Sequence, residues 1–150
     1  AEAFKLKEQK AIEEHLSETF VNPNDAKACA EQIGRAFKYI GNLVKEGIVK
    51  DEAEFSRIGG IAFNATRLIS VARWCAESKY ISEKELWEYV DFADELAHKS
   101  LTSWEDYGKS YLIGYCLWGA DGYELKHSAT TVKKLMNEPD SPWQHFSFAK

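Results

Sequence analysis

The sequence predicts an all-α protein that folds as a single compact bundle of five to six helices with an irregular C-terminal tail. Apolar residues recur at the three- and four-residue spacing of a helix face along almost the whole chain. No segment shows the two-residue alternation of a half-buried strand. The breaks between the periodic segments are short, as is typical of antiparallel neighbours in one bundle. We therefore expect residues 1–150 to form one domain, because a chain of this length can bury a sizeable core.

The first two helices are predicted on either side of a break at residues 22–25. The first helix covers residues 2–20, and Asp25 is placed to cap the second. Gly47 is expected to end that second helix. One face of the second helix is apolar and consists of Ala26, Ala30, Ile33, Phe37, Ile40 and Val44.

A long helix is predicted from Asp51 to about Ser78, because Asp51 and Glu54 have the spacing of a capping box. Its broad apolar face consists of Ile58, Ile61, Ala62, Ala65, Leu68, Ile69, Ala72 and Ala76. The opposite side carries Arg67 and Trp74, two turns apart. We expect neighbouring helices to cover both sides, which makes this the central helix of the bundle.

Two further capping boxes predict the starts of the next helices. Ser82 with Glu85 starts a helix with an apolar face, and Thr102 with Glu105 starts an aromatic one. The apolar face of the former consists of Leu86, Tyr89, Val90, Ala93, Leu96 and Ala97. A shorter helix is expected at about residues 129–137, and the tail after it holds two of the three prolines.

Glycines and aromatic rings indicate where helices pack closely. Gly59-Gly60 costs the long helix roughly 1 kcal/mol per glycine relative to alanine, and the close approach of another backbone would explain it. Gly108 and Gly114 indicate similar contacts on the aromatic helix. The rings of that helix recur at helical spacing, which favours packing in the core over a cofactor site. They belong to Trp104, Tyr107, Tyr111, Tyr115 and Trp118, and Trp143 of the tail is expected to dock across the bundle.

Composition and charge exclude several function classes. A net charge of -5 and a pI of about 5.4 argue against a surface that follows nucleic-acid phosphates. No stretch approaches the roughly 18 apolar residues of a membrane span, and the N-terminus lacks the layout of a signal peptide. Three widely spaced cysteines, Cys29, Cys75 and Cys116, favour a reducing cytoplasm. The chain does not begin with Met, which leaves open whether the native protein extends upstream of Ala1.

No local motif predicts a catalytic, metal or cofactor site. The four histidines show no HExxH pattern, and the cysteines form no CxxC pair. The chain also lacks GxSxG, GxGxxG and P-loop sequences. We therefore predict no catalytic residues, no metal ligands and no cofactor.

The arginines of the long helix allow three interpretations, of which plain exposure at the surface is the simplest. In the second, Arg67 or Arg73 is buried and pairs with a carboxylate of a neighbouring helix, because a buried arginine is almost always paired. The candidate carboxylates are Glu85, Glu105 and Asp106. In the third, Arg67, Arg73 and Trp74 line a pocket for an anion or a partner, since the planar guanidinium suits carboxylates and rings.

Three segments carry a recognisable pattern: NATRLISVARWCAESKYISEKELWEYV, SWEDYGKSYLIGYCLW and DSPW. Together they resemble the bacterial family named domain of unknown function 1266, over roughly residues 60–143. The matching residues are Arg67, Arg73, Trp74, Tyr80, Ile81, Glu85, Ser103, Trp104, Glu105, Tyr111, Gly114, Trp118, Ser141, Pro142 and Trp143.

The chain departs from the family pattern at two positions. Asn64 stands where the pattern has Asp, which weakens any proposal of an Asp–Arg pair on the long helix. Lys79 stands where the pattern has Gly, so a left-handed turn residue there would cost about 1 kcal/mol.

The resemblance implies a helical bacterial cytosolic domain and brings no established activity. Some members lie in genomic surroundings rich in polymorphic-toxin genes, an association that connects the family with immunity or partner binding. We therefore expect a non-enzymatic, cytoplasmic protein-binding module, with an immunity protein that neutralises a toxin as one form. The alternative is an enzyme or small-anion-binding domain with an Arg/Trp pocket. The candidate binding residues are Arg67, Arg73, Trp74, Glu85, Trp104 and Glu105.

Overall fold

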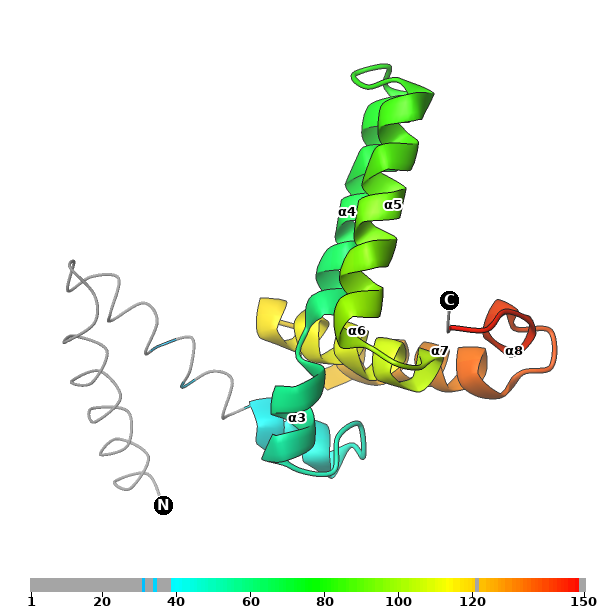
Figure 1. Ribbon diagram of the computed structural model, residues 1–150. Coiled ribbons are helices and arrows are strands. Elements are labelled where there is room, and N and C mark those ends of the chain that lie inside the picture. Colours follow the sequence, from blue (N-terminus) through cyan, green and yellow to red (C-terminus); the bar gives the residue numbers. More distant parts are fainter. Residues whose placement is uncertain (1–30, 32–33, 35–38, 121, 149–150) are drawn as a thin grey trace. The chain divides into compact units, whose positions relative to one another are not determined.

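The computed structural model describes residues 31, 34, 39–120 and 122–148 (Figure 1). The chain divides into two units, residues 1–42 and 43–150. The helix predicted at residues 2–20, the cap at Asp25 and the thiol of Cys29 lie outside the described residues.

Six helices follow residue 50 in the described part of the chain, and no strand occurs there. They are α3 (Glu52–Ile58), α4 (Ile61–Glu77), α5 (Glu83–Ser100), α6 (Trp104–Trp118), α7 (Gly122–Asn137) and α8 (Pro142–His145). The predicted all-α class is confirmed. Residues 39–45 are also helical, and Gly47, with φ 68°, follows as the predicted end.

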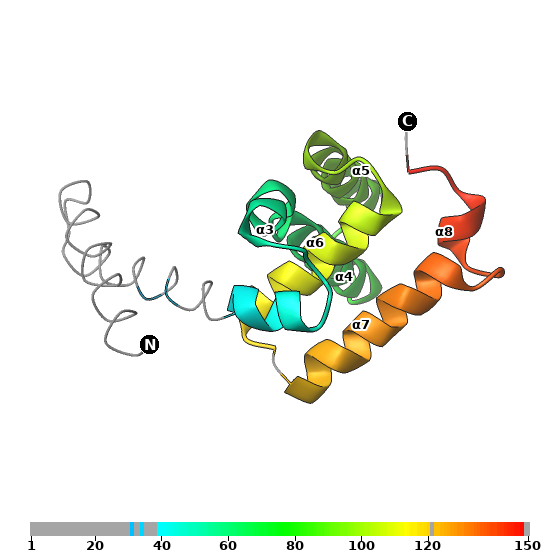
Figure 2. The same cartoon turned by 90° about the horizontal axis from the view of Figure 1, so that it is seen from below.

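The second unit is built on a helical hairpin and a pair of helices across its base. α4 and α5 run antiparallel, and α6 crosses the first half of α4 (Figure 1). α7 lies alongside α6 and runs in the opposite direction, with α8 at its end (Figure 2). α3 packs against α6 as well. The contacts of α6 with α3, α4 and α7 make it the helix on which the candidate site is assembled.

The long helix predicted from Asp51 to Ser78 is two helices, so this prediction was wrong. The chain breaks at Gly59, which has φ 59°, a backbone conformation that favours glycine. α4 then starts where Gly60 meets Gly114 of α6. A Cβ atom on Gly60 would lie 2.8 Å from the Gly114 Cα atom, and one on Gly114 would lie 2.4 Å from Phe63 Cβ. The predicted close approach of a second backbone is thereby confirmed.

A serine on α6 replaces the missing cap of α4. Gly60 has no side chain that could accept a hydrogen bond from the first turn. Instead, the backbone N–H of Ala62 donates to Ser110 Oγ at 3.0 Å, and both residues are buried. Because Ser110 is fully buried, this bond fixes the start of α4 on α6 in addition to the glycine contact.

The predicted capping boxes have different outcomes. The one that starts α5 is confirmed, since Ser82 Oγ accepts from Glu85 N and Glu85 Oε2 accepts from Ser82 N. The one at the start of α6 is displaced by one residue. There Ser103 caps the helix, and the Thr102 hydroxyl instead donates to the Asp106 carboxylate.

The aliphatic face of α4 is packed as predicted, but beyond Gly60 no described helix covers the side that carries Arg67 and Trp74. Ala62, Ala65 and Ala72 are buried, whereas Arg67 and Trp74 are exposed. The prediction that α4 is covered on both sides was therefore wrong for the described residues. The physical reason is that α6 crosses only the first half of α4, so among the described helices the rest of the hairpin consists of α4 and α5 alone.

The turn between α4 and α5 carries a left-handed lysine. Lys79 has φ 61°, as expected where the family pattern has Gly. Lys79→Gly is expected to raise the free energy of unfolding by about 0.5–1 kcal/mol, because the Cβ atom disfavours this conformation. Urea denaturation measures the change. Lys79→Ala is the matched control, since it removes the same charged chain and keeps Cβ; an equal gain from both variants would assign the effect to charge.

Candidate binding surface and cavity

Arg67 is exposed and lies over aromatic rings. Its guanidinium carbon is 5.1 Å from the ring centre of Trp118 and 5.6 Å from that of Phe63. It forms no ion pair with any described carboxylate, so the prediction of a buried pair was wrong for Arg67. The rings attract the cation through their quadrupoles, and that attraction is weak where water can compete.

Apolar residues extend this cation–ring contact along the outer side of α4. Trp74 lies two turns beyond Arg67, with Val71 between them, and Trp118 follows Leu117 at the end of α6. Trp74 and Trp118 are each 64% exposed, and Val71 and Leu117 are exposed as well. We call these residues the Arg67 surface; it consists of Arg67, Val71, Trp74, Leu117 and Trp118.

Arg73 does not join this surface through any described contact. Its Nη2 atom lies 3.8 Å from Glu77 Oε1 in the same helix, and both side chains are about two-thirds exposed. The prediction that Arg73 is held by a carboxylate of another helix was therefore wrong.

The candidate carboxylates have partners of their own. Glu85 bonds to Ser82, as described for α5, and Glu105 pairs with Lys109 on α6 at 2.8 Å. Asp106 accepts from the Nη1 and Nη2 atoms of Arg57, each at 3.0 Å. Neither Glu85 nor Glu105 lies on the Arg67 surface.

Two ion pairs fasten α3 to α6. In the first, the hydrogen bonds from Arg57 lower the pKa of the buried Asp106 carboxyl, while its burial acts in the opposite direction. In the second, Lys109 Nζ lies 2.8 Å from Glu54 Oε1, and this hydrogen bond lowers the pKa of Glu54. Sequence reasoning missed both pairs, because α3 and α6 are about fifty residues apart and no local pattern connects them.

Trp104 anchors the C-terminal tail. Its ring stacks on that of Trp143, with centres 5.1 Å apart and planes 11° apart, and its Nε1–H donates to the Phe146 carbonyl at 2.7 Å. His98 Nε2 lies 2.6 Å from the Phe148 carbonyl oxygen. The predicted docking of Trp143 on the bundle is thus confirmed, and the role of Trp104 in the described contacts is to hold the tail.

The aromatic stripe of α6 is only partly in the core. The fully covered positions of this helix carry smaller side chains, such as Ser110, Ile113 and Cys116. The rings of Tyr107, Tyr111 and Tyr115 are half-buried, and Trp118 is mostly exposed. The prediction of core packing therefore holds in part, and the half-buried rings are available to line a cavity.

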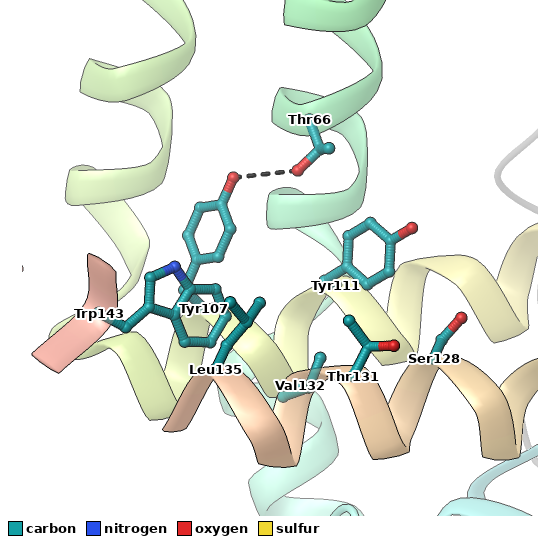
Figure 3. Close-up of a pocket in the computed structure, with 8 residues that line it drawn as sticks. All are labelled: Thr66, Tyr107, Tyr111, Ser128, Thr131, Val132, Leu135 and Trp143. Carbon is teal, nitrogen blue, oxygen red and sulfur yellow. Dashed lines mark hydrogen bonds between the residues drawn. The ribbon is translucent and has the colours of Figure 1, made fainter. Parts of the chain in front are cut away.

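A cavity of about 330 Å³ lies where α4, α6, α7 and α8 meet (Figure 3). Thr66 of α4 forms one wall, and the side chains of α7 form the facing one. The lining residues are Thr66, Tyr107, Tyr111, Ser128, Thr131, Val132, Leu135 and Trp143. None of the six residues predicted to bind lines this cavity. The helix predicted at about residues 129–137 begins earlier, at Gly122. Sequence reasoning missed the cavity because its walls come from four helices, and no local pattern specifies how these pack.

Two further kinds of site were sought among the described residues. They contain no group of three or more His, Cys, Asp or Glu side chains that could hold a metal ion. Within the same ranges, every helix is too short or too polar to cross a membrane.

Comparison with known proteins identifies a relative and a family. The chain is 26% identical over 80 residues to the inner membrane protein YnjI of Escherichia coli (strain K12). The match covers 53% of this chain but only 23% of that protein. No solved structure matches the chain. The family named "Protein of unknown function (DUF1266)" matches residues 1–148, well beyond the segment in which the sequence pattern was recognised. The chain therefore belongs to the DUF1266 family of proteins of unknown function.

Proposed function

We propose that residues 43–150 form a protein-binding module whose contact site is the Arg67 surface. The single observation that carries this proposal is the exposed Arg67 guanidinium stacked over Trp118, with Trp74 equally exposed on the same side of α4. Tryptophan, tyrosine and arginine are the residues that most often dominate the energy of protein interfaces.

The composition of the Arg67 surface also supports a protein partner rather than a small anion. Its other members, Val71, Trp74, Leu117 and Trp118, are large apolar side chains that lose water favourably when a partner covers them. Its cation already lies over two rings, which reduces part of the entropy cost of ordering the side chain when it donates to a partner carboxylate or carbonyl.

Neutralisation of a toxin is a narrower form of this proposal. It requires that the partner of the Arg67 surface is a toxin, which the identity of that partner would test. The cytoplasm is the proposed location, supported by the free thiol of Cys75. The Escherichia coli relative is named an inner membrane protein, and the matched 80 residues are a small part of it. In a protein of that kind, the module would be joined to membrane segments elsewhere in the chain.

Site-specific photo-crosslinking in the host cell tests the proposal. A benzophenone amino acid at position 74 is expected to give a discrete adduct with a partner protein. The same amino acid at position 87 is the matched control, because Trp87 is a comparably exposed tryptophan on α5 that is not part of the Arg67 surface. An adduct at position 87 as strong as at 74, or none at either position, would contradict the proposal.

Substitution of the cation completes this experiment. Arg67→Glu is expected to reduce the adduct at position 74 at least tenfold. Arg67→Ala should lower the free energy of unfolding by less than about 1 kcal/mol, since exposed cation–ring contacts are weak. A thermal melt of both variants therefore separates loss of binding from loss of fold.

A further inference from the structure

The cavity between α4, α6 and α7 has the dimensions of a small-molecule site. Its volume of about 330 Å³ lies at the lower end of the range for ligand pockets, which is roughly 300–1,000 Å³. A space of this size accommodates a molecule of one or two rings.

The aromatic wall of the cavity is held in place before any ligand binds. The Trp143 ring is stacked on that of Trp104, and it lies nearly perpendicular to the Tyr107 ring, with the two ring centres 6.1 Å apart. Gly108 permits this arrangement, because a Cβ atom there would lie 2.6 Å from Val132 Cγ1 and 3.3 Å from the Trp143 ring. The rings therefore present fixed flat faces, which favours a flat ligand.

None of the described residues that line the cavity carries a charged side chain. Two of the lining residues are tyrosines, and burial raises the pKa of Tyr111, so this phenol stays neutral near pH 7. An ionised ligand would leave water without finding a counter-charge, and that loss is costly. The cavity thus favours a neutral molecule.

Three of the five hydroxyls that line the cavity are arranged to accept hydrogen bonds. Thr66 has one O–H, and it donates to the Ala62 carbonyl at 2.8 Å. The 3.0 Å contact between Thr66 Oγ1 and the Tyr107 hydroxyl (Figure 3) must then be donated by Tyr107. Thr131 likewise donates to the His127 carbonyl at 3.2 Å. With their hydrogens committed, these three oxygens offer lone pairs, which match a ligand that carries its own donor.

We propose that this cavity binds a neutral, flat aromatic molecule that carries an N–H or O–H group. The site is distinct from the Arg67 surface, and its occupancy does not depend on the protein partner proposed above. The two proposals therefore fail or succeed separately.

Indole is the probe, because it is flat, neutral and carries one N–H donor. Amide chemical shifts of the full chain, followed by NMR as indole is added, are expected to change around Ser128, Thr131 and Trp143. A ligand of this size is expected to bind with a Kd on the order of 0.5 mM. Absence of saturable changes at these residues up to about tenfold that concentration would overturn the proposal.

Two analogues of indole test whether the ligand needs a hydrogen-bond donor and whether it must be neutral. N-methylindole lacks the donor and should bind about fivefold more weakly, the effect of one hydrogen bond. Indole-3-carboxylate carries a charge and should bind at least about tenfold more weakly. Equal or tighter binding of either analogue would overturn the corresponding half of the proposal. N-acetyltryptophanamide, if it bound more than about tenfold tighter than indole, would instead assign the cavity to a peptide side chain.

Neighbouring threonines on α7 provide matched variants that test the location. Thr131→Trp places a ring in the cavity and is expected to weaken indole binding at least tenfold. Thr130→Trp is the control, because Thr130 is also exposed and also bonds to the carbonyl four residues earlier, yet it does not line the cavity. It should bind indole within twofold of the wild type.

The amide spectrum of each variant reports whether it is folded. If Thr131→Trp does not fold, Ser128→Phe at the same wall is used instead, with the same expected loss. Indole binding by a folded cavity-filling variant at the wild-type Kd would overturn the assignment to this cavity.

Discussion

Gly114→Ala is expected to lower the free energy of unfolding by about 2–3 kcal/mol, which corresponds to a fall in Tm of roughly 10 °C. The added Cβ atom would lie 2.4 Å from Phe63 Cβ and 2.7 Å from the Gly60 carbonyl oxygen. One of these neighbours is backbone, so it cannot rotate away, and α4 must move off α6. Such a movement would also lengthen the buried bond from Ala62 N to Ser110 Oγ.

Gly41→Ala is the matched control for this experiment. Gly41 is helical, and a Cβ atom there would meet no atom of the described residues within 4 Å. The same substitution should therefore be neutral or stabilising by up to about 1 kcal/mol, the difference in helix propensity. Urea denaturation of both variants measures the contrast. Equal stability of Gly114→Ala and the wild type would show that α4 and α6 are farther apart than described.

Asp106→Asn is expected to destabilise the protein by about 2 kcal/mol at neutral pH. Breaking a buried ion pair costs about 3–5 kcal/mol, and the exposure of Arg57 reduces that figure. Asp106 is only 7% exposed, and it accepts from Arg57 and Thr102 at once. The asparagine keeps the shape of the side chain but turns an N–H donor toward the guanidinium.

The difference in the free energy of unfolding between wild type and Asp106→Asn should depend on pH if it comes from the ion pair. Hydrogen bonds from Arg57 hold the pKa of Asp106 below its usual value in the folded protein. The stabilisation is therefore complete above the unfolded pKa of about 4, and it is lost as the pH falls through the lower folded value. Wild type and Asp106→Asn should thus converge in stability as urea titrations move from pH 7 toward pH 2.

A second substitution of Asp by Asn, at an exposed position, controls for the loss of one negative charge. Asp91→Asn on the exposed side of α5 should change stability by less than about 0.5 kcal/mol at pH 7. The Glu54–Lys109 pair also weakens in acid, since the pKa of Glu54 is lowered too, but this loss is common to all variants. A difference between wild type and Asp106→Asn that stays constant down to pH 2 would contradict the ion-pair explanation.

Local chemistry is the part of the fold that the sequence could predict. The capping box at Ser82 and Glu85, the end of a helix at Gly47 and the left-handed turn at Lys79 each depend on a few adjacent residues. The glycine contact between α4 and α6 was expected as well, because a costly residue in a helix requires a compensating approach.

The candidate site could not be predicted from the helical periodicity of the sequence. A helical pattern assigns Arg67 and Trp74 to one side of α4, but it does not say whether another helix covers that side. Coverage is set by the point at which α6 crosses α4, which follows from packing at Gly60 and Gly114. An uncovered arginine stacks on rings, whereas a covered one needs a carboxylate, so the predicted role of Arg67 changed with this one geometric fact.

The C-terminal tail is held through its backbone, so the side chains that it exposes can vary. The side chains of Trp104 and His98 bond to the carbonyls of Phe146 and Phe148, and a carbonyl is present whatever the residue. The Phe146 ring itself is 68% exposed and takes no part in that anchor. Positions such as His145 and Phe146 can therefore diverge among family members without releasing Trp143 from the cavity wall. Selection could in this way change what the tail presents to its surroundings while the frame beneath it stays the same.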